Sequence, residues 1–193
     1  MTREKLYSIY SMFYKLLYSS SFMNFGINSK IIYPIKVSLK KNIFIGENVR
    51  IGYKTSLNAE SLTNEKPVVL KFSDGTCIGN FNHIVCSKKI VFGKNVLTSD
   101  RVYISDNLHD YSDISLPIIK QKIIQLNEVY IGDGSWIGEN VCIIGSSVGK
   151  NSVVGANSVV VSDIPDFSVA VGIPAKVIKK YNFKTNKWEK VKK

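Results

Sequence analysis

An aliphatic residue recurs every six positions along most of this 193-residue chain. From Ile131 the sequence reads "IGDGSW", "IGENVC", a shorter unit "IIGSS", and then "VGKNSV" and "VGANSV". An α-helix spaces its apolar residues three and four apart, and a simple strand spaces them two apart, so neither produces a sustained period of six. The leading residues of the repeat are Ile45, Ile51, Leu57, Phe72, Ile78, Ile84, Phe92, Thr98, Ile104, Ile131, Ile137, Ile143, Val148, Val154 and Val160.

This period predicts short strands joined by tight turns. If each hexad forms one strand and one turn, the leading residue points inward and stacks on its equivalent in the next coil. Glycine and asparagine then occupy turn positions that favour a positive φ. Three hexads close one triangular coil, and the coils bury their apolar edges only against each other. The sequence therefore predicts an all-β solenoid.

Composition and charge limit the classes of protein and partner. A hydrophobic content of 45% fits one globular domain, and a net charge of +11 suits nucleic acid, an anionic membrane surface or a phosphate-bearing ligand. No nucleic-acid-binding motif accompanies the charge, so we expect no nucleic-acid partner. Cys77, Cys86 and Cys142 are odd in number and lack CxxC spacing, which predicts free thiols in a cytoplasmic protein.

The two ends of the chain depart from the repeat. Leu6, Ile9, Phe13 and Leu17 recur at helical spacing, which predicts an amphipathic helix over residues 2–20. This helix is expected to pack on the protein itself, and peripheral membrane association is the alternative. We divide the chain into a helical segment and lead-in at 1–42, a repeat domain at 43–174, and a cap with a basic tail at 175–193. The cap is predicted to contain a short helix at 177–180 and a hairpin.

A long excursion interrupts the repeat at residues 109–129. Long irregular segments in a compact repeat are usually functional or disordered. Pro117 and the apolar run "IIKQKII" predict an ordered flap rather than a disordered loop.

Two spaced segments carry a family resemblance, "WIGENVCIIG" and "SVVGANSVVVSDIPDFSVAVGIPAKVIKK". With the hexads, they make residues 43–180 resemble the hexapeptide-repeat acyltransferases, in the branch of galactoside, maltose and capsule-sugar O-acetyltransferases. The resemblance implies a left-handed parallel β-helix, acetyl-CoA as co-substrate, and a homotrimer with active sites in clefts between neighbouring prisms. The zinc-dependent carbonic anhydrases on the same fold need three histidine ligands, and this chain has two histidines, so no metal is expected.

The same resemblance implies the catalytic groups. His109 in "SDNLHD" matches the family's general base, although Asn107 stands where the family often has an earlier histidine. The backbone N–H of Glu139, just after "WIG", matches the donor to the oxyanion. Asn82 in "NFN" matches an asparagine that contacts the acceptor.

Coenzyme contacts follow from the resemblance as well. Trp136, Gly138 and Ala156 match positions along the pantetheine, and Lys176 and Lys179 match basic residues at the phosphate end. The family also has a hydroxyl and a basic side chain shortly before "DIP", and this chain carries Val161 and Ser162 there.

Three of these assignments have structural alternatives. Asp106 could orient the His109 ring by accepting its second N–H, as carboxylates do in catalytic triads, or it could cap a turn. His83 could line the acceptor pocket or be an ordinary histidine at a strand edge. Trp136 and Ala156 could be there for packing alone.

We expect transfer of an acetyl group from acetyl-CoA to a hydroxyl of a sugar or saccharide precursor. Because the nucleophile comes from the acceptor, the resemblance implies a ternary complex without an acyl-enzyme. The alternatives are N-acetylation of an amino sugar and a non-catalytic structural solenoid.

Overall fold

The computed structural model describes residues 3–191 and consists mostly of short parallel strands. Sheet 1 contains β1 (Asn24–Phe25), β4 (Ile43–Ile45), β7 (Val69–Phe72), β10 (Lys89–Phe92) and β15 (Val129–Ile131). Sheet 2 contains β2 (Lys30–Ile31), β5 (Arg50–Ile51), β8 (Cys77–Ile78), β11 (Leu97–Thr98), β16 (Trp136–Ile137), β18 (Val153–Val154), β20 (Ser168–Gly172), β21 (Ala175–Asn182) and β22 (Lys187–Lys190). Sheet 3 contains β3 (Lys36–Ser38), β6 (Ser56–Ala59), β9 (His83–Cys86), β12 (Tyr103–Ser105), β17 (Cys142–Ile144) and β19 (Val159–Val160).

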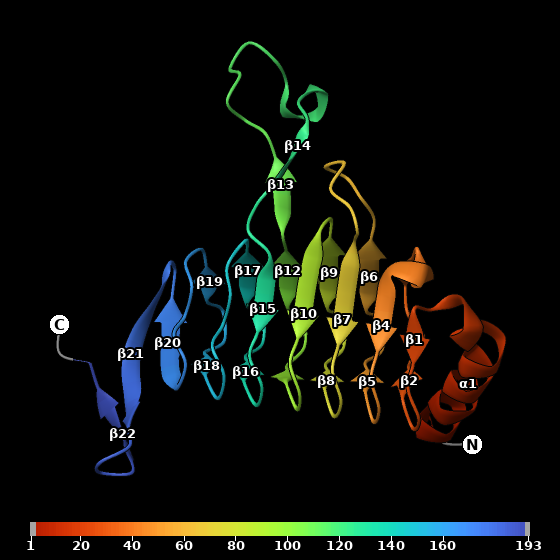
Figure 1. Ribbon diagram of the computed structural model, residues 1–193, viewed down its shortest axis with the longest axis horizontal. Coiled ribbons are helices and arrows are strands. Elements are labelled where there is room, and N and C mark those ends of the chain that lie inside the picture. The colour runs from red at the N-terminus through yellow and green to blue at the C-terminus, as the bar shows by residue number, and fades with distance from the viewer. Residues whose placement is uncertain (1–2, 192–193) are drawn as a thin grey trace.

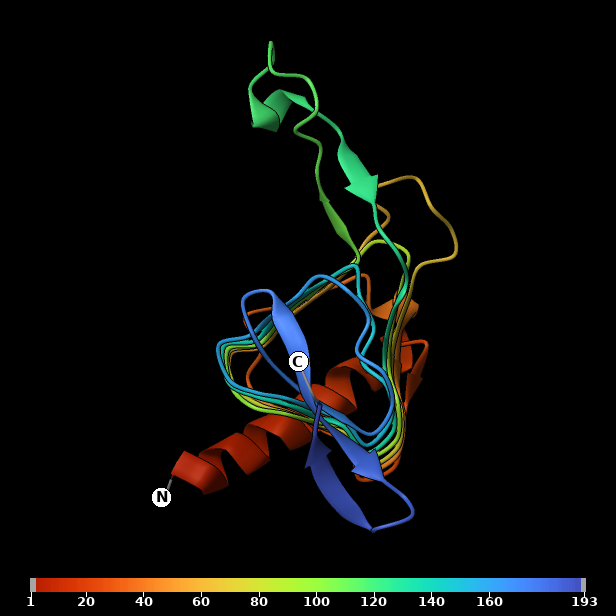
Figure 2. The same ribbon diagram turned by 90° about the vertical axis from the view of Figure 1, so that its left-hand side faces the viewer.

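Successive strands pass from sheet 1 to sheet 2 to sheet 3 and back, so the chain winds in coils of three strands. Figure 1 shows the coils stacked along the long axis, and Figure 2 shows their triangular outline from one end. We call the turns from sheet 1 to sheet 2 the first corner, those from sheet 2 to sheet 3 the second corner, and those from sheet 3 to sheet 1 the third corner.

The leading residues of the hexads form the core, as predicted. All fifteen are buried, including Thr98. The two aromatic members, Phe72 and Phe92, lie on neighbouring strands of sheet 1 and stack with ring centroids 4.8 Å apart. The core is therefore a set of side-chain columns that run along the axis of the coil.

The prediction of glycine and asparagine at positive φ is confirmed at the first corner, with one exception. The residues that adopt positive φ there are Asn28, Asn48, Gly75, Asn95, Gly134, Asn151 and Phe167. At the second corner the equivalent residues are Tyr33, Lys54, Phe81, Arg101, Asn140 and Asn157. The second corner therefore carries large side chains in a conformation that usually excludes them.

A helix covers the first coil, as predicted. α1 (Arg3–Tyr18) is followed by a 3-10 turn, η1 (Ser19–Ser21), whereas Thr2 of the predicted helix lies outside the described residues. Tyr14 and Phe22 bury their rings against the core of the first coil. The parallel sheets already include β1, β2 and β3, so coiled structure precedes Ile43. A second 3-10 turn, η2 (Lys40–Asn42), leads into β4.

The prediction of a short helix at residues 177–180 is wrong. These residues belong to β21, which pairs antiparallel with β20 and with β22, so the predicted hairpin is present. The last strand of the coil exposes unpaired backbone groups, and only an extended segment can pair with them. Val177 and Ile178 are also β-branched, which favours a strand. Within residues 3–191, no helix is long and apolar enough to cross a membrane.

Candidate active site

The flap leaves the coil at the third corner as a two-stranded hairpin. β13 (Asn107–His109) pairs antiparallel with β14 (Ile123–Gln125), and a 3-10 turn, η3 (Ile118–Lys120), lies between them. Figure 1 shows this hairpin standing well away from the coil. The sequence predicted an ordered flap but gave no sign that its two stems pair.

His109 is the last residue of β13 and lies opposite Ile123. Its side chain is exposed, and its imidazole makes no hydrogen bond to any residue that the structure describes. Both ring nitrogens are therefore available to a bound molecule.

Asp106 lies three residues away and is fully buried, but its carboxylate does not reach His109. It accepts hydrogen bonds from the backbone N–H groups of Ser87, Lys88 and Lys89 at 2.7 to 2.8 Å, and from the Asn107 side chain at 3.0 Å. These contacts are those of a turn-capping residue. The structure therefore favours turn capping by Asp106 over orientation of the His109 ring.

Asn107 and Gln125 fix the base of the flap. The Asn107 side chain is buried beneath it, and the Gln125 side-chain amide donates to the backbone carbonyl of Asp106 at 2.6 Å. The Gln125 carbonyl accepts a bond of 2.7 Å from the Thr63 hydroxyl, which belongs to the loop after β6. Sequence reasoning missed Gln125, because its partners are far away in the chain.

Glu139 lies at the second corner, between β16 and β17, and its backbone N–H has no partner among the described residues. At two earlier turns of this corner, the equivalent N–H groups of Tyr53 and Asn80 donate to the side chains of Asn80 and Asp100, one coil further on. The N–H of Asp100, like that of Glu139, has no partner among the described residues. The residue one coil beyond Glu139 is Ala156, which offers no acceptor. A free donor therefore faces outward at Glu139.

Other second-corner side chains surround this donor. The Arg101 guanidinium donates to the Glu139 carboxylate at 2.6 Å and lies over the Phe81 ring, 5.7 Å from its centroid. The Trp136 indole N–H donates to the Ser99 hydroxyl at 3.1 Å, and half of the ring is exposed. A Cβ on Gly138 would lie 2.7 Å from the backbone nitrogen of Ala156, so only glycine fits there.

Lys176 and Lys179 lie on β21, at the C-terminal end of sheet 2. With Lys190 they line a surface pocket of about 420 Å³, whose remaining walls are apolar. Three ammonium groups around an apolar hollow suit an anionic group with an apolar extension. The sequence indicated two of these lysines, and only the pairing of β21 with β22 adds Lys190.

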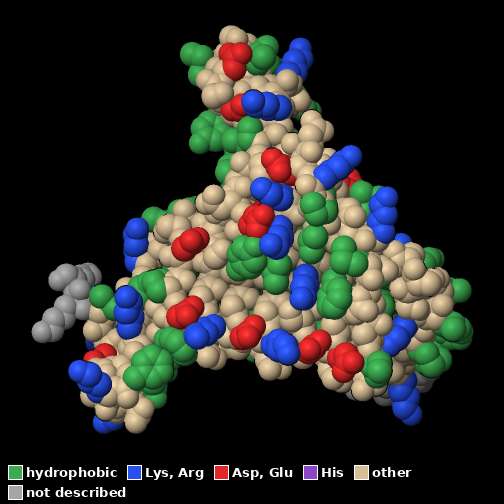
Figure 3. All heavy atoms as spheres, viewed as in Figure 1, with side chains coloured by type: hydrophobic (Ala, Val, Ile, Leu, Met, Phe, Trp, Pro, Cys, Tyr) green, Lys and Arg blue, Asp and Glu red, His purple; other side chains and the backbone are tan. Residues whose placement is uncertain are grey.

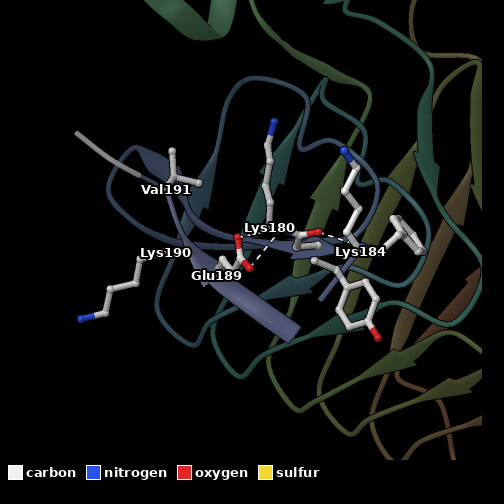
Figure 4. A pocket seen from close by; sticks show the side chains of 8 residues that line it. Lys180, Lys184, Glu189, Lys190 and Val191 are labelled. Atoms are coloured by element: carbon white, nitrogen blue, oxygen red, sulfur yellow. Dashed lines mark hydrogen bonds between the residues drawn. The ribbon is translucent and has the colours of Figure 1, made fainter. Parts of the chain in front are cut away.

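A larger hollow of about 610 Å³ lies beside it on the terminal hairpin (Figure 4). Its lysines point in different directions, and the Glu189 carboxylate lies among them. Hydrogen bonds from Asn182 and Thr185 lower the pKa of the Glu189 carboxyl, so it carries a negative charge at neutral pH. We assign no anion to this hollow.

The two candidate acceptor residues lie on sheet 3 or at its edge. Asn82 is buried, and its side chain bonds to the Thr98 hydroxyl and to the backbone of Ser99 and Val102. His83 is exposed and packs edge to face against the Tyr103 ring at 5.6 Å. Partial burial, and secondarily the charge of Lys36, lower the pKa of His83, which keeps this ring neutral at pH 7.

A single chain does not bring His109 and Glu139 together. β12 and β17 are parallel neighbours, with Ile104 opposite Ile143. His109 follows β12 whereas Glu139 precedes β17, so the two residues lie at opposite ends of sheet 3. Within the described residues, no group of three His, Cys, Asp or Glu side chains is arranged to hold a metal ion.

A parallel three-sheet coil with an exposed histidine and a free corner N–H is the architecture of a hexapeptide-repeat enzyme. The family model described as "hexapeptide repeat of succinyl-transferase" matches residues 128–162. The putative lipopolysaccharide biosynthesis O-acetyl transferase WbbJ of Escherichia coli K12 is 35% identical over 171 residues, which cover 84% of this chain and 85% of that protein. The chain therefore belongs to the hexapeptide-repeat acetyltransferase family.

Solved structures agree with this assignment. A maltose O-acetyltransferase from Clostridium difficile 630 is 29% identical, with a TM-score of 0.54 over 83% of this chain and 71% of that one. AntD, an N-acyltransferase from Bacillus cereus solved with dTDP and 3-hydroxybutyryl-CoA, has a TM-score of 0.71 over 89% of this chain and 90% of that one. At 20% identity, AntD shows a shared fold only.

Proposed function

We propose that this protein transfers an acetyl group from acetyl-CoA to a hydroxyl of a sugar or saccharide precursor. The observation that carries the proposal is the free N–H of Glu139, beside a position where Ala156 replaces the side-chain acceptor of earlier coils. Membership of an acetyltransferase family, with relatives named for O-acetyl transfer to sugars, supports the reaction class and the left-handed sense of the coil.

His109 is the proposed general base. A neutral imidazole accepts the proton of the acceptor hydroxyl as its oxygen attacks the thioester carbonyl, which typically contributes about two to four powers of ten in rate. The tetrahedral intermediate then expels the thiolate of coenzyme A, which recovers the proton from the imidazolium. The acceptor is the nucleophile, so the acetyl group passes directly to it and no acyl-enzyme forms.

The Glu139 N–H is the proposed donor to the oxyanion of that intermediate. One preorganised donor of this kind contributes about 3 kcal/mol to transition-state stabilisation. The ion pair with Arg101 turns the Glu139 carboxylate toward Arg101. This keeps the carboxylate from competing for the free N–H.

The site requires two copies of the chain. Because His109 and Glu139 lie at opposite ends of sheet 3, the base of one copy must meet the N–H of a neighbour. In a homotrimer, each flap reaches the second corner of the next copy. One type of contact, repeated by the three-fold symmetry, then brings His109 of one copy to Glu139 of its neighbour at three equivalent sites.

Coenzyme A is proposed to lie along the second corner toward the C-terminal end. Trp136 and Ala156 flank the pantetheine, and Lys176 and Lys179 neutralise its phosphates as point charges. Three free cysteines suit a reducing cytosol.

The proposal is tested with purified protein, acetyl-CoA and a panel of defined saccharides with and without a free amine. Release of thiol measures the rate, and NMR of the product locates the acetyl group. We expect O-acetylation, and a loss of about 10²-fold or more in kcat for His109→Ala. Ile173→Ala, at an exposed position in the turn between β20 and β21, is the control and should keep full activity.

Two results would contradict it. Full activity of His109→Ala on a verified acceptor would show that His109 is not the general base. Products that carry the acetyl group only on nitrogen replace the function with N-acetylation of an amino sugar.

A further inference from the structure

Helix α1 is apolar on two opposite faces. Tyr10 and Tyr14 lie on the face that packs against the first coil. The opposite face carries residues that are 42 to 76% exposed, namely Leu6, Ile9, Phe13, Leu16 and Leu17. Their spacing places them side by side along one stripe of the helix. No described part of the chain covers this stripe, which we call the outer face of α1.

Basic residues are in excess at this end of the molecule, as they also are in the C-terminal segment at 176–193. Residues 1–54 contain nine Lys and Arg against two acidic residues, whereas residues 55–175 contain nine against twelve. Lys30 and Arg50 line one hollow beside α1, Lys54 lines another, and Lys36 and Lys40 line a third. Figure 3 shows hydrophobic side chains at this right-hand end with Lys and Arg among them. Positive charge therefore flanks α1 on the side where the helix meets the first coil, next to the exposed apolar stripe.

The position of α1 leaves this surface accessible in an assembly. Figure 1 shows the helix at the extreme end of the stack of coils, beside β1 and β2. Copies that associate through the sides of the coil, as the proposed active site requires, place their helices together at one end.

We propose that the outer face of α1 docks on a membrane surface that contains anionic lipids. α1 has 16 residues, about 24 Å in length, so it lies in the plane of the interface. Its apolar side chains enter the boundary between headgroups and acyl chains, while the surrounding Lys and Arg contact lipid phosphates. Burial of the apolar side chains and attraction of the basic residues to the phosphates are each weak, and together they give a stable, reversible attachment.

The test uses the full-length protein and flotation with lipid vesicles, without acetyl-CoA or acceptor, so it does not depend on the proposed function. Vesicles of phosphatidylcholine mixed with phosphatidylglycerol are compared with vesicles of phosphatidylcholine alone. Leu16→Glu with Leu17→Glu places two carboxylates on the outer face. Ile173→Glu with Phe183→Glu makes the same kind of change at exposed positions near the C-terminal end of the coil and is the matched control.

We expect the parent and the control variant to float with the anionic vesicles, and added salt to weaken the binding. The outer-face variant should bind at least tenfold more weakly, because it loses two buried leucines. Circular dichroism should show the same fold in all three proteins, since the substituted side chains are exposed.

The proposal is overturned if the parent does not float with anionic vesicles, or if the outer-face variant floats equally well. It is also overturned if that variant has a smaller mass in sedimentation while vesicle binding is unaffected. In that case a second copy of the chain covers the outer face.

Discussion

The first and second corners of the coil make the same turn with different residues. At the first corner, asparagine or glycine occupies nearly every position with positive φ. At the second corner the same conformation is imposed on Tyr33, Lys54, Phe81 and Arg101. A left-handed residue other than glycine or asparagine costs roughly 1–2 kcal/mol, so the second corner forgoes stability that the first corner keeps.

The difference indicates which corner carries function. The first corner follows local conformational preference, and its side chains serve the turn. The strained turn of Arg101 lies one coil before Glu139, and the Arg101 side chain binds the Glu139 carboxylate. The turns beside Glu139 and Ala156 themselves have Asn140 and Asn157 at positive φ.

The largest expected effect comes from restoring a first-corner type of contact at the second corner. Ala156→Asn supplies an acceptor one coil beyond Glu139, as Asn80 does for the N–H of Tyr53. Occupation of the Glu139 N–H should lower kcat about 100-fold, the usual cost of losing one oxyanion donor. Steady-state kinetics of thiol release measures the change.

Ala156→Leu is the matched control, because leucine has a similar size and no acceptor. Obstruction of the coenzyme path would raise KM for acetyl-CoA in both variants. An equal loss of kcat in both would show that bulk, and not the hydrogen bond, is responsible.

A smaller effect is expected on β21, at the C-terminal end of sheet 2. Lys176→Ala with Lys179→Ala removes two charges from the pocket on β21. KM for acetyl-CoA should rise about tenfold with kcat little changed, since neutralisation of the phosphates acts on binding in the ground and transition states alike. The rise should shrink in high salt, because exposed charges are screened.

Lys71→Ala with Lys94→Ala removes the same charge from sheet 1 and from the first corner, and it should leave KM unchanged. Equal KM values for the two double variants would contradict the proposal that the β21 pocket binds the phosphates of coenzyme A.

The smallest effect is a reciprocal exchange between the corners. Lys54→Asn should raise the free energy of unfolding by about 1 kcal/mol, because asparagine tolerates the left-handed conformation. Asn95→Lys, at the equivalent turn position of the first corner, should lower it by a similar amount. Both positions are exposed, so urea unfolding followed by circular dichroism reports mainly the backbone term. The corners would be energetically equivalent if both exchanges were neutral.

Much of the fold could be read from periodicity. The fifteen leading residues identified from the hexads are all buried, and the spacing of Leu6, Phe13 and Leu17 identified α1. The same columns also contain Ile31, Ile164 and Ala170 in the first and last coils, which the hexads did not indicate. The terminal segment at 177–180 could not be read in this way. Its strand conformation depends on pairing with β20, which local preference does not describe.

The candidate site was also predicted from the sequence only in part. The sequence placed His109 where the repeat stops, at the base of the flap, and the structure leaves its ring exposed there. It also offered Asp106 as a partner for that ring. Whether Asp106 faces His109 depended on where the loop at residues 87–89 passes, and the carboxylate bonds to that loop instead.

By itself, then, the sequence determined the period, the inward column of side chains and the residues at the turns, because each depends on neighbours within one hexad. The tertiary structure alone decided which polar groups are satisfied between coils. The N–H of Glu139 meets no side-chain acceptor at Ala156 in the next coil, and Arg101 reaches Glu139 because their coils are adjacent. Contacts between coils join residues far apart in the chain, and no local pattern records them.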